Sequence, residues 1–133
     1  MWSPDPSRVA LVVDDESFAR LFTVQILLDQ GFMVLEAGDA GEALQLLAAN
    51  DDVALVVTDI SMPGEIDGLG LAAQVRLLHP DIPVIVASGR VFPIRPEADG
   101  RSCFLAKPYT ATALVEAIAG VTAASPVAAD TKR

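Results

Sequence analysis

Near the middle of the chain, the sequence reads Val56-Val57-Thr58-Asp59-Ile60-Ser61-Met62-Pro63. The run that leads into it, Val53–Thr58, is apolar almost throughout, which predicts a strand covered on both faces, as in a parallel sheet. This strand ends at an acid, Asp59, and Met62-Pro63 predict a turn beyond it. An acid at the end of a buried strand is a candidate functional residue.

Four other apolar runs are strand candidates, and one of them, Ile82–Ala87, is likewise apolar almost throughout. Together with the central one, they predict strands at Arg8–Val13, Phe32–Ala37, Val53–Thr58, Ile82–Ala87 and Ser102–Ala106. Between them, helical periodicity predicts helices from about Glu16 to Asp29, after Asp39, from Asp67 to a point before Pro80, and after Thr110. Strands that alternate with helices through right-handed crossovers predict an α/β fold with a doubly wound, five-stranded parallel sheet.

The helix ends and faces add detail to this prediction. Asp39 and Glu42 have the spacing of a capping box, and Asp67 is a predicted N-cap. The first helix is expected to face the core with a stripe made of Ala19, Phe22, Ile26 and Leu27.

One segment, Arg90–Gly100, departs from the alternation. A helix belongs between the last two strands, but Pro93 and Pro96 lie within this segment, and each would remove a helical hydrogen bond. We therefore expect a loop or one irregular turn there, so that this helix is short or absent.

The composition describes a globular protein with an acidic surface. The chain has 133 residues, which suits one domain, and its net charge is -9 with a pI of about 4.3. This charge argues against nucleic acid and anionic membranes as partners, because their phosphates attract Lys and Arg. It is compatible with binding a cation or a basic protein.

Other features of the sequence concern location and domain limits. Cys103 is the only cysteine, so no intrachain disulfide can form, and no stretch has the length of a membrane span or the character of a signal peptide. We therefore expect a cytoplasmic protein. Residues 1–7 are expected to be an N-terminal extension, 8–122 the domain, and 123–133 a disordered tail; Met1 and this tail favour a complete protein.

Polar side chains follow four of the predicted strands at the point where each ends. They are Asp14 and Asp15, Asp59, Ser88, and Lys107. Because the carboxyl ends of parallel strands gather at one edge of a sheet, these residues are expected to meet in one pocket. Three carboxylates and one ammonium leave a charge of -2 there, and oxygen ligands favour a hard divalent cation such as Mg²⁺.

Such a pocket suits phosphoryl transfer. Mg²⁺ and Lys107 would neutralise the oxygens of an incoming phosphoryl group while a carboxylate attacks it, which gives an acyl phosphate. Ser88 could donate a hydrogen bond to one of those oxygens. Each residue also has an ordinary structural explanation as a helix cap, a turn residue or a surface lysine, but their joint position at four strand ends favours the pocket.

These residues match a known family. The chain resembles the receiver domain of two-component response regulators from about Arg8 to Thr122. The matching motifs are Leu11-Val12-Val13-Asp14-Asp15, Val57-Thr58-Asp59-Ile60-Ser61-Met62-Pro63, Asp67-Gly68, Ala87-Ser88-Gly89 and Lys107-Pro108-Tyr109. The resemblance implies the flavodoxin-like strand order 2-1-3-4-5.

The resemblance also implies roles for the pocket residues. Asp59 is the implied phosphoacceptor, and Lys107 would grip the phosphoryl group. Asp15 and Asp59 would bind Mg²⁺ directly with the backbone carbonyl of Ser61, while Asp14 would act mostly through water.

Other implied roles concern signalling. Ser88 and Phe104 take the positions of the switch hydroxyl and the switch aromatic. A histidine kinase or a histidine phosphotransfer protein would be the donor, an unknown protein would receive the signal, and the chain would catalyse only its own phosphorylation and dephosphorylation.

Three departures from the family pattern affect these expectations. Gly64-Glu65 make the loop beside the pocket one residue longer than usual, although every ligand is kept. Phe104 lacks the hydroxyl of the more common tyrosine. The helix weakened by Pro93 and Pro96 belongs to the surface through which many members signal.

The first predicted helix also carries apolar residues away from its core stripe. These are Phe18, Leu21 and Leu28. A helix that is apolar on two sides usually buries both, and the family docks this helix against the helical bundle that carries the donor histidine. We expect the same docking here; scattered exposed apolar residues are the alternative.

Two other functions remain open at this point. One is a scaffold of the same fold that never uses Asp59, although it would have no reason to keep Lys107 and Asp14 together. The other is a small Mg²⁺-dependent phosphohydrolase. Such enzymes commonly place an Asp-x-Asp motif on the first strand and add a cap domain, whereas this chain has adjacent aspartates, Asp14 and Asp15, and no cap.

Overall fold

The computed structural model describes residues 8–61, 64, 66–89 and 102–123. Its strands are β1 (Val9–Val13), β2 (Met33–Ala37), β3 (Val53–Asp59), β4 (Val84–Ser88) and β5 (Ser102–Ala106). Its helices are α1 (Ser17–Asp29), α2 (Ala40–Ala49), α3 (Gly68–Leu78) and α4 (Ala111–Ala123).

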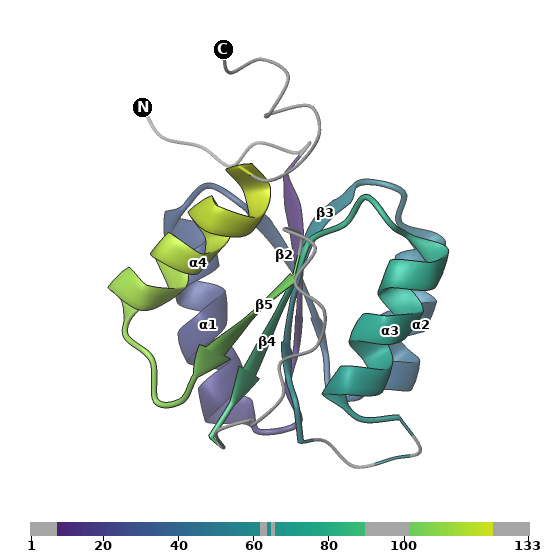
Figure 1. Cartoon of the computed structure of the whole chain (residues 1–133), viewed down its shortest axis with the longest axis horizontal. Helices are drawn as coiled ribbons and strands as arrows, with labels where there is room; N and C mark the ends of the chain where they lie inside the picture. Colours follow the sequence, from purple (N-terminus) through teal and green to yellow (C-terminus); the bar gives the residue numbers. More distant parts are fainter. Residues whose placement is uncertain (1–7, 62–63, 65, 90–101, 124–133) are drawn as a thin grey trace.

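The five strands form one parallel sheet in the order β2-β1-β3-β4-β5, as the resemblance implied. Helices α1 and α4 cover one face of this sheet, and α2 and α3 cover the other (Figure 1). Each face has its own apolar core, because strands buried on both sides project side chains alternately into the two layers. The predicted α/β architecture is confirmed.

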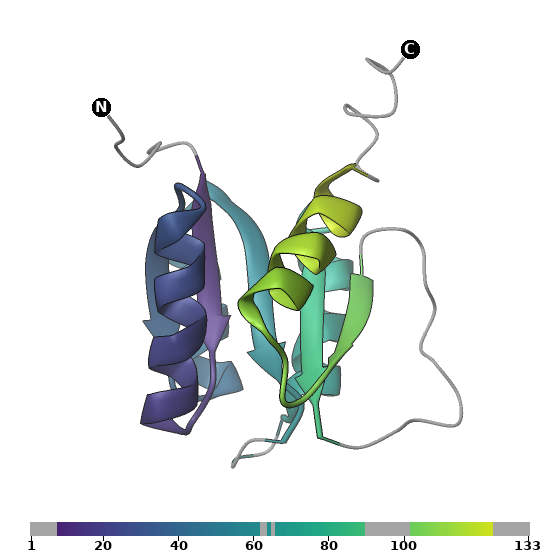
Figure 2. The same ribbon diagram turned by 90° about the vertical axis from the view of Figure 1, so that its left-hand side faces the viewer.

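All strands point in the same direction, so their carboxyl ends lie along one edge of the sheet (Figure 2). Strand β1 begins and α4 ends at the opposite edge. Two strands reach further toward the carboxyl edge than the sequence predicted: β3 includes Asp59, and β4 runs from Val84 to Ser88. Strand β4 starts late because Pro83, which has no N–H, precedes it, while Ile82 is held in a turn by a bond to the His79 carbonyl.

The predicted N-cap Asp67 is confirmed, and so is the Asp39 half of the predicted capping box, but the Glu42 carboxylate accepts from Gly38 N and not from Asp39 N, as a capping box requires. The side chains of Asp39, Asp67 and Thr110 each accept a hydrogen bond from the backbone N–H three residues later. Helix α1 is capped by Glu16, which the sequence placed inside the helix; its carboxylate accepts from Ala19 N. Helix α3 ends at Leu78, two residues before Pro80.

The predicted core stripe of α1 is partly wrong. Ile26 and Leu27 are buried as expected, but Phe22 is 47% exposed, and Thr23 and Val24 are buried instead. Thr23 can be buried because its hydroxyl donates to the Ala19 carbonyl and bonds to the Tyr109 hydroxyl. Helix α1 is therefore rotated relative to the prediction, so that Phe22 lies at the surface.

The prediction that one helix is short or absent concerned Arg90–Gly100, which lies outside the described residues. Within the described ranges there are four helices, and the last of them, α4, has 13 residues, so the described structure gives no support to a missing fourth helix. The expected N-terminal extension and nearly all of the expected tail also lie outside these ranges. None of the helices described has the length and apolar character that a membrane crossing requires.

Candidate functional site

The carboxyl edge of the sheet gathers the residues that the sequence predicted for a pocket. Asp14 and Asp15 directly follow β1, and Lys107 directly follows β5. Asp59 and Ser88 are the last residues of β3 and β4. The central position of β3, between β1 and β4, places Asp59 between the other acids and Ser88.

Lys107 and Asp59 form an ion pair at this edge. The distance from Lys107 Nζ to Asp59 Oδ1 is 2.6 Å, and the two side chains are 30% and 11% exposed. Burial lowers the pKa of Lys107, but the hydrogen bond to Asp59 and the charge of that carboxylate outweigh it, so that the pKa lies above its usual 10.5. Lys107 is therefore held as a cation against Asp59.

Three carboxylates lie close enough to share one cation. Ligand oxygens of Asp14, Asp15 and Asp59 all lie within 4.8 Å of one another. Such a set of hard oxygen donors fits Mg²⁺, which prefers carboxylates and water to softer ligands.

Asp14 is the most buried acid of this cluster, with 6% of its surface exposed. Burial raises the pKa of its carboxyl above the usual 3.8, and the charge of Asp59 adds to this effect; a hydrogen bond from Glu16 N at 3.0 Å opposes it. A buried carboxyl with a raised pKa next to another carboxylate is a site where a cation relieves repulsion.

Ser88 and Phe104, the predicted switch residues, lie on neighbouring strands. Ser88 is buried, and its carbonyl accepts a hydrogen bond from Lys107 N at 2.8 Å. Phe104 pairs with Val86 in the sheet and is partly buried against the core on the α2 and α3 side. Ser61 is exposed in the loop after β3. The switch roles and the Ser61 carbonyl as a ligand stay predictions.

Gly68 lies close against the backbone of Asp59 and Ile60, a contact that the sequence alone did not reveal. Its N–H donates to the Ile60 carbonyl at 2.9 Å. A Cβ at this position would lie 2.1 Å from the Asp59 carbonyl oxygen and 2.6 Å from Ile60 Cα. The only signal in the sequence was the Asp67-Gly68 pair, which marked a helix start but not a close approach to β3.

Tyr109 connects the pocket to α1, and it too was missed. It follows the cis Lys107–Pro108 peptide bond, its hydroxyl bonds to Thr23 on α1, and its ring centroid lies 5.9 Å from that of Phe22. Burial raises its pKa above the usual 10.0. Beside these rings is an apolar cavity of about 480 Å³, lined by Glu16, Phe18, Ala19 and Phe22 of the α1 region and by Lys107, Pro108 and Tyr109.

The three residues predicted to dock a partner do not lie together. Phe18 and Leu21 are 81% and 52% exposed, and the exposed Phe22 joins them on the same helix. Leu28 instead is partly buried against the core on the α1 and α4 side. The exposed apolar surface of α1 thus consists of Phe18, Leu21 and Phe22, near the N-terminal half of the helix.

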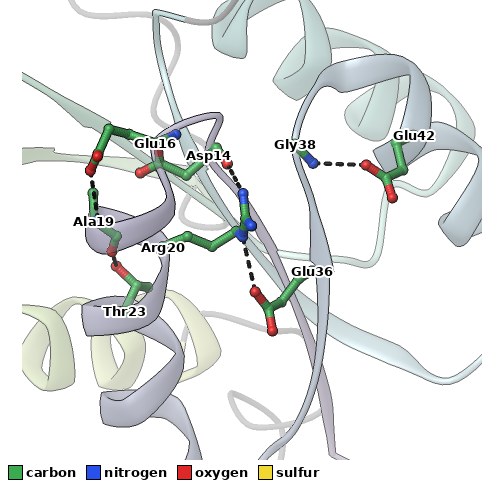
Figure 3. Close-up of polar contacts among 8 residues, drawn as sticks. All are labelled: Asp14, Glu16, Ala19, Arg20, Thr23, Glu36, Gly38 and Glu42. Carbon is green, nitrogen blue, oxygen red and sulfur yellow. Dashed lines mark hydrogen bonds and ion pairs between the residues drawn. The ribbon is translucent and has the colours of Figure 1, made fainter.

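Arg20 is a further residue that sequence reasoning missed. Its guanidinium donates to the backbone carbonyl of Asp14 and pairs with Glu36 on β2 (Figure 3). No sequence pattern indicated this role, because an arginine on a helix surface is most often solvated.

Comparisons with known proteins agree with this geometry. Residues 10–119 match the model of the response regulator receiver domain. The chain is 36% identical over 117 residues to a chemotaxis protein CheY homolog of Campylobacter jejuni, which covers 84% of this chain and 89% of that protein. It is also 37% identical over 108 residues to the sensor kinase CckA of Brucella abortus, but spans only 11% of that kinase and is matched over 78% of its own length.

Among solved structures, the response regulator protein TrrA of Thermotoga maritima is similar with a TM-score of 0.75 and 26% identity, over 86% of this chain and 98% of that one. The family match covers most of the chain. The matched range includes the acidic cluster, the Lys107–Asp59 ion pair and nearly all of the sheet around them. The chain belongs to the response regulator receiver domain family of two-component signalling.

Proposed function

We propose that this chain is a phosphoacceptor that receives a phosphoryl group on Asp59 from a histidine of a kinase or a phosphotransfer protein. The observation that carries the proposal is the ion pair of Lys107 with Asp59 beside the carboxylates of Asp14 and Asp15. It brings a nucleophilic oxygen, a fixed cation and a set of ligands for a second cation to one edge of the sheet.

In the proposed transfer, a carboxylate oxygen of Asp59 attacks the phosphorus of a phosphohistidine. The new O–P bond forms as the P–N bond breaks, and the imidazole leaves and takes up a proton. Lys107, already paired with Asp59, would move its contact to a phosphoryl oxygen. Mg²⁺, held directly by Asp15, Asp59 and the Ser61 carbonyl and by Asp14 mostly through water, would supply charge neutralisation for the remaining oxygens.

A relative supports the magnesium assignment. The TrrA structure from Thermotoga maritima is described as a complex with Mg²⁺-BeF, and this chain has an acidic triad suited to a hard cation. We further propose that Ser88 donates to a phosphoryl oxygen and that Phe104 changes its packing when Ser88 moves, so that a partner reads the phosphorylated state.

The test is intact mass after incubation with acetyl phosphate and Mg²⁺. The wild type should gain one phosphoryl group, about 80 Da, and Asp59→Asn should gain none. Asp29→Asn, which changes an exposed acid at the far end of α1, is the matched control and should label like the wild type. Absence of label in the wild type, with cation binding demonstrated separately, would favour the scaffold over the phosphoacceptor.

We also propose that the exposed apolar surface of α1 docks the protein that carries the donor histidine. Phe18 and Phe22 line the cavity that Lys107 also lines, and Leu21 is exposed on the same helix, so a docked helix would reach the pocket. Leu28, which packs against the core, would support α1 from within.

Leu21→Asp tests the docking proposal. It should slow phosphotransfer at least tenfold from any histidine kinase or phosphotransfer protein that labels the wild type, and leave labelling by acetyl phosphate unchanged, because a small donor needs no docking surface. Leu77→Asp makes the same change at an exposed leucine of α3 and should leave both reactions unchanged. An equal loss with both donors would refute the docking role of Leu21.

A further inference from the structure

Arg20, on α1, contacts the backbone of Asp14, directly after β1, and the side chain of Glu36 on β2 (Figure 3). From α1, its Nη1 donates to the backbone carbonyl of Asp14 at 2.6 Å, and its Nε lies 2.9 Å from Glu36 Oε1 on β2. The Arg20 side chain is 23% exposed, so its two partners replace much of its hydration. A planar guanidinium holds two acceptors in a fixed relative direction, which an ammonium cannot do.

The Asp14 backbone is held on both sides by these contacts. Its N–H donates to the Ala37 carbonyl of β2 at 3.0 Å, and its carbonyl accepts from Arg20. That carbonyl belongs to the peptide bond between Asp14 and Asp15. Because a peptide bond is planar, fixing its carbonyl fixes the direction in which the chain enters Asp15.

We infer that Arg20, held by Glu36, is a positioning residue for the divalent cation: it orients the Asp14–Asp15 peptide and so aims the exposed Asp15 carboxylate at the oxygens of Asp14 and Asp59. The inference rests on the proposed function, which includes the cation. Arg20 does not bind the cation itself and acts only through Asp14 and Asp15.

The charge of Arg20 and its positioning role predict opposite effects of its removal on cation binding. Arg20 is a positive charge next to a site that takes a cation. If its charge alone mattered, its removal would strengthen cation binding, because like charges repel. If it positions Asp15, its removal should weaken cation binding, typically by tenfold or more for a group that orients a ligand.

The experiment measures the dissociation constant of Mn²⁺, a hard cation of the same ligand preference, from the electron paramagnetic resonance signal of the free ion. The variants are Arg20→Gln, Arg20→Lys and, as a control for one lost positive charge, Arg76→Gln in the last turn of α3. Circular dichroism at the titration temperature confirms that each variant is folded, so loss of stability alone would not change the constant.

We expect binding about tenfold weaker in Arg20→Gln, a smaller loss in Arg20→Lys, and no loss in Arg76→Gln. Unchanged or tighter binding in Arg20→Gln, or wild-type binding in Arg20→Lys, would overturn the positioning role while the proposed function stands. Failure of the wild type itself to bind Mn²⁺ would overturn the cation site of the proposed function, and this inference with it.

Discussion

At the scale of single residues, the pocket contains a buried carboxylate, Asp14, whose ionised form lowers the stability of the fold. Asp14 is 6% exposed and lies near Asp59 and Asp15. Its raised pKa means that the folded protein binds the Asp14 proton more tightly than the unfolded chain does. Stability therefore falls as the pH rises from 3.8 through the raised pKa, and the ionised group is a cost at neutral pH.

Asp14→Asn should consequently raise the free energy of unfolding at neutral pH in the absence of divalent cations. The amide can still accept from Glu16 N and carries no buried charge. Urea unfolding over a pH series checks this: the advantage of the variant should disappear as the pH falls below 3.8. With saturating Mg²⁺ the order should reverse, since the wild type has the better ligand. A variant less stable than the wild type without metal would contradict the prediction.

Gly68 shows what the sequence could not reveal about the same site. The motif around Asp59 located the proposed phosphoacceptor, and the strand ends located its neighbours. The distance between the start of α3 and the β3 backbone depends on tertiary packing, which a sequence pattern does not contain. For this reason Gly68 was predicted only as part of a helix start.

Gly68→Ala should cost about 3 kcal/mol or more of stability, because the new Cβ would collide with the Asp59 carbonyl at 2.1 Å and with backbone that cannot give way easily. Labelling by acetyl phosphate should fall as well, since Asp59 must shift. Gly120→Ala is the matched control, because a Cβ there meets open space in α4, and it should gain about 0.5–1 kcal/mol. Equal effects of the two substitutions would contradict the close approach.

At the scale of elements, the sequence located every described helix and strand but misjudged the rotation of α1. The apolar spacing favoured Phe22 for the core and gave Thr23 no special place. The structure buries Thr23 because its hydroxyl finds partners in Ala19 and Tyr109. Tyr109 lies 86 residues away from Thr23 in the sequence. Helical periodicity describes only neighbouring residues, so it cannot predict this partner.

The Thr23–Tyr109 hydrogen bond should tie α1 to the loop after β5. Thr23 donates its own proton to the Ala19 carbonyl, so the Tyr109 hydroxyl is the donor between the two. Tyr109→Phe and Thr23→Val should each cost about 1 kcal/mol of unfolding free energy. In the double variant the losses should fall short of their sum by a similar amount, as expected for direct partners. Simple additivity in chemical denaturation would refute the coupling.

Tyr109→Phe has a second consequence at high pH. The raised pKa of the only tyrosine means that stability is lost as the pH rises from 10.0 through the folded value. The raised pKa of Lys107 has an effect of the same sign: the protein loses further stability as the pH rises above 10.5. Tyr109→Phe should therefore keep the loss of stability at high pH that comes from Lys107, and it should lack the part that comes from Tyr109.

At the scale of the whole molecule, strand order and pocket chemistry follow from the same property of the fold. Parallel strands linked by helices place all carboxyl ends at one edge, so five residues spread from Asp14 to Lys107 meet there. The order itself came from resemblance to a family, because alternation of strands and helices permits several orders. The chain as a whole is acidic, with a net charge of -9, and three of its acids are within 4.8 Å of one another.

This concentration of charge predicts that Mg²⁺ stabilises the whole domain. A ligand that binds only the folded state at 100 times its dissociation constant adds about 2.7 kcal/mol. Thermal unfolding in MgCl₂ should therefore occur at a higher temperature than in NaCl of the same ionic strength, which screens surface charge equally. Asp59→Asn should lose most of this difference, whereas Asp51→Asn, at an exposed turn before β3, should keep it. If both variants kept the full difference, Mg²⁺ would be acting on the net charge of the protein and not on the acidic cluster.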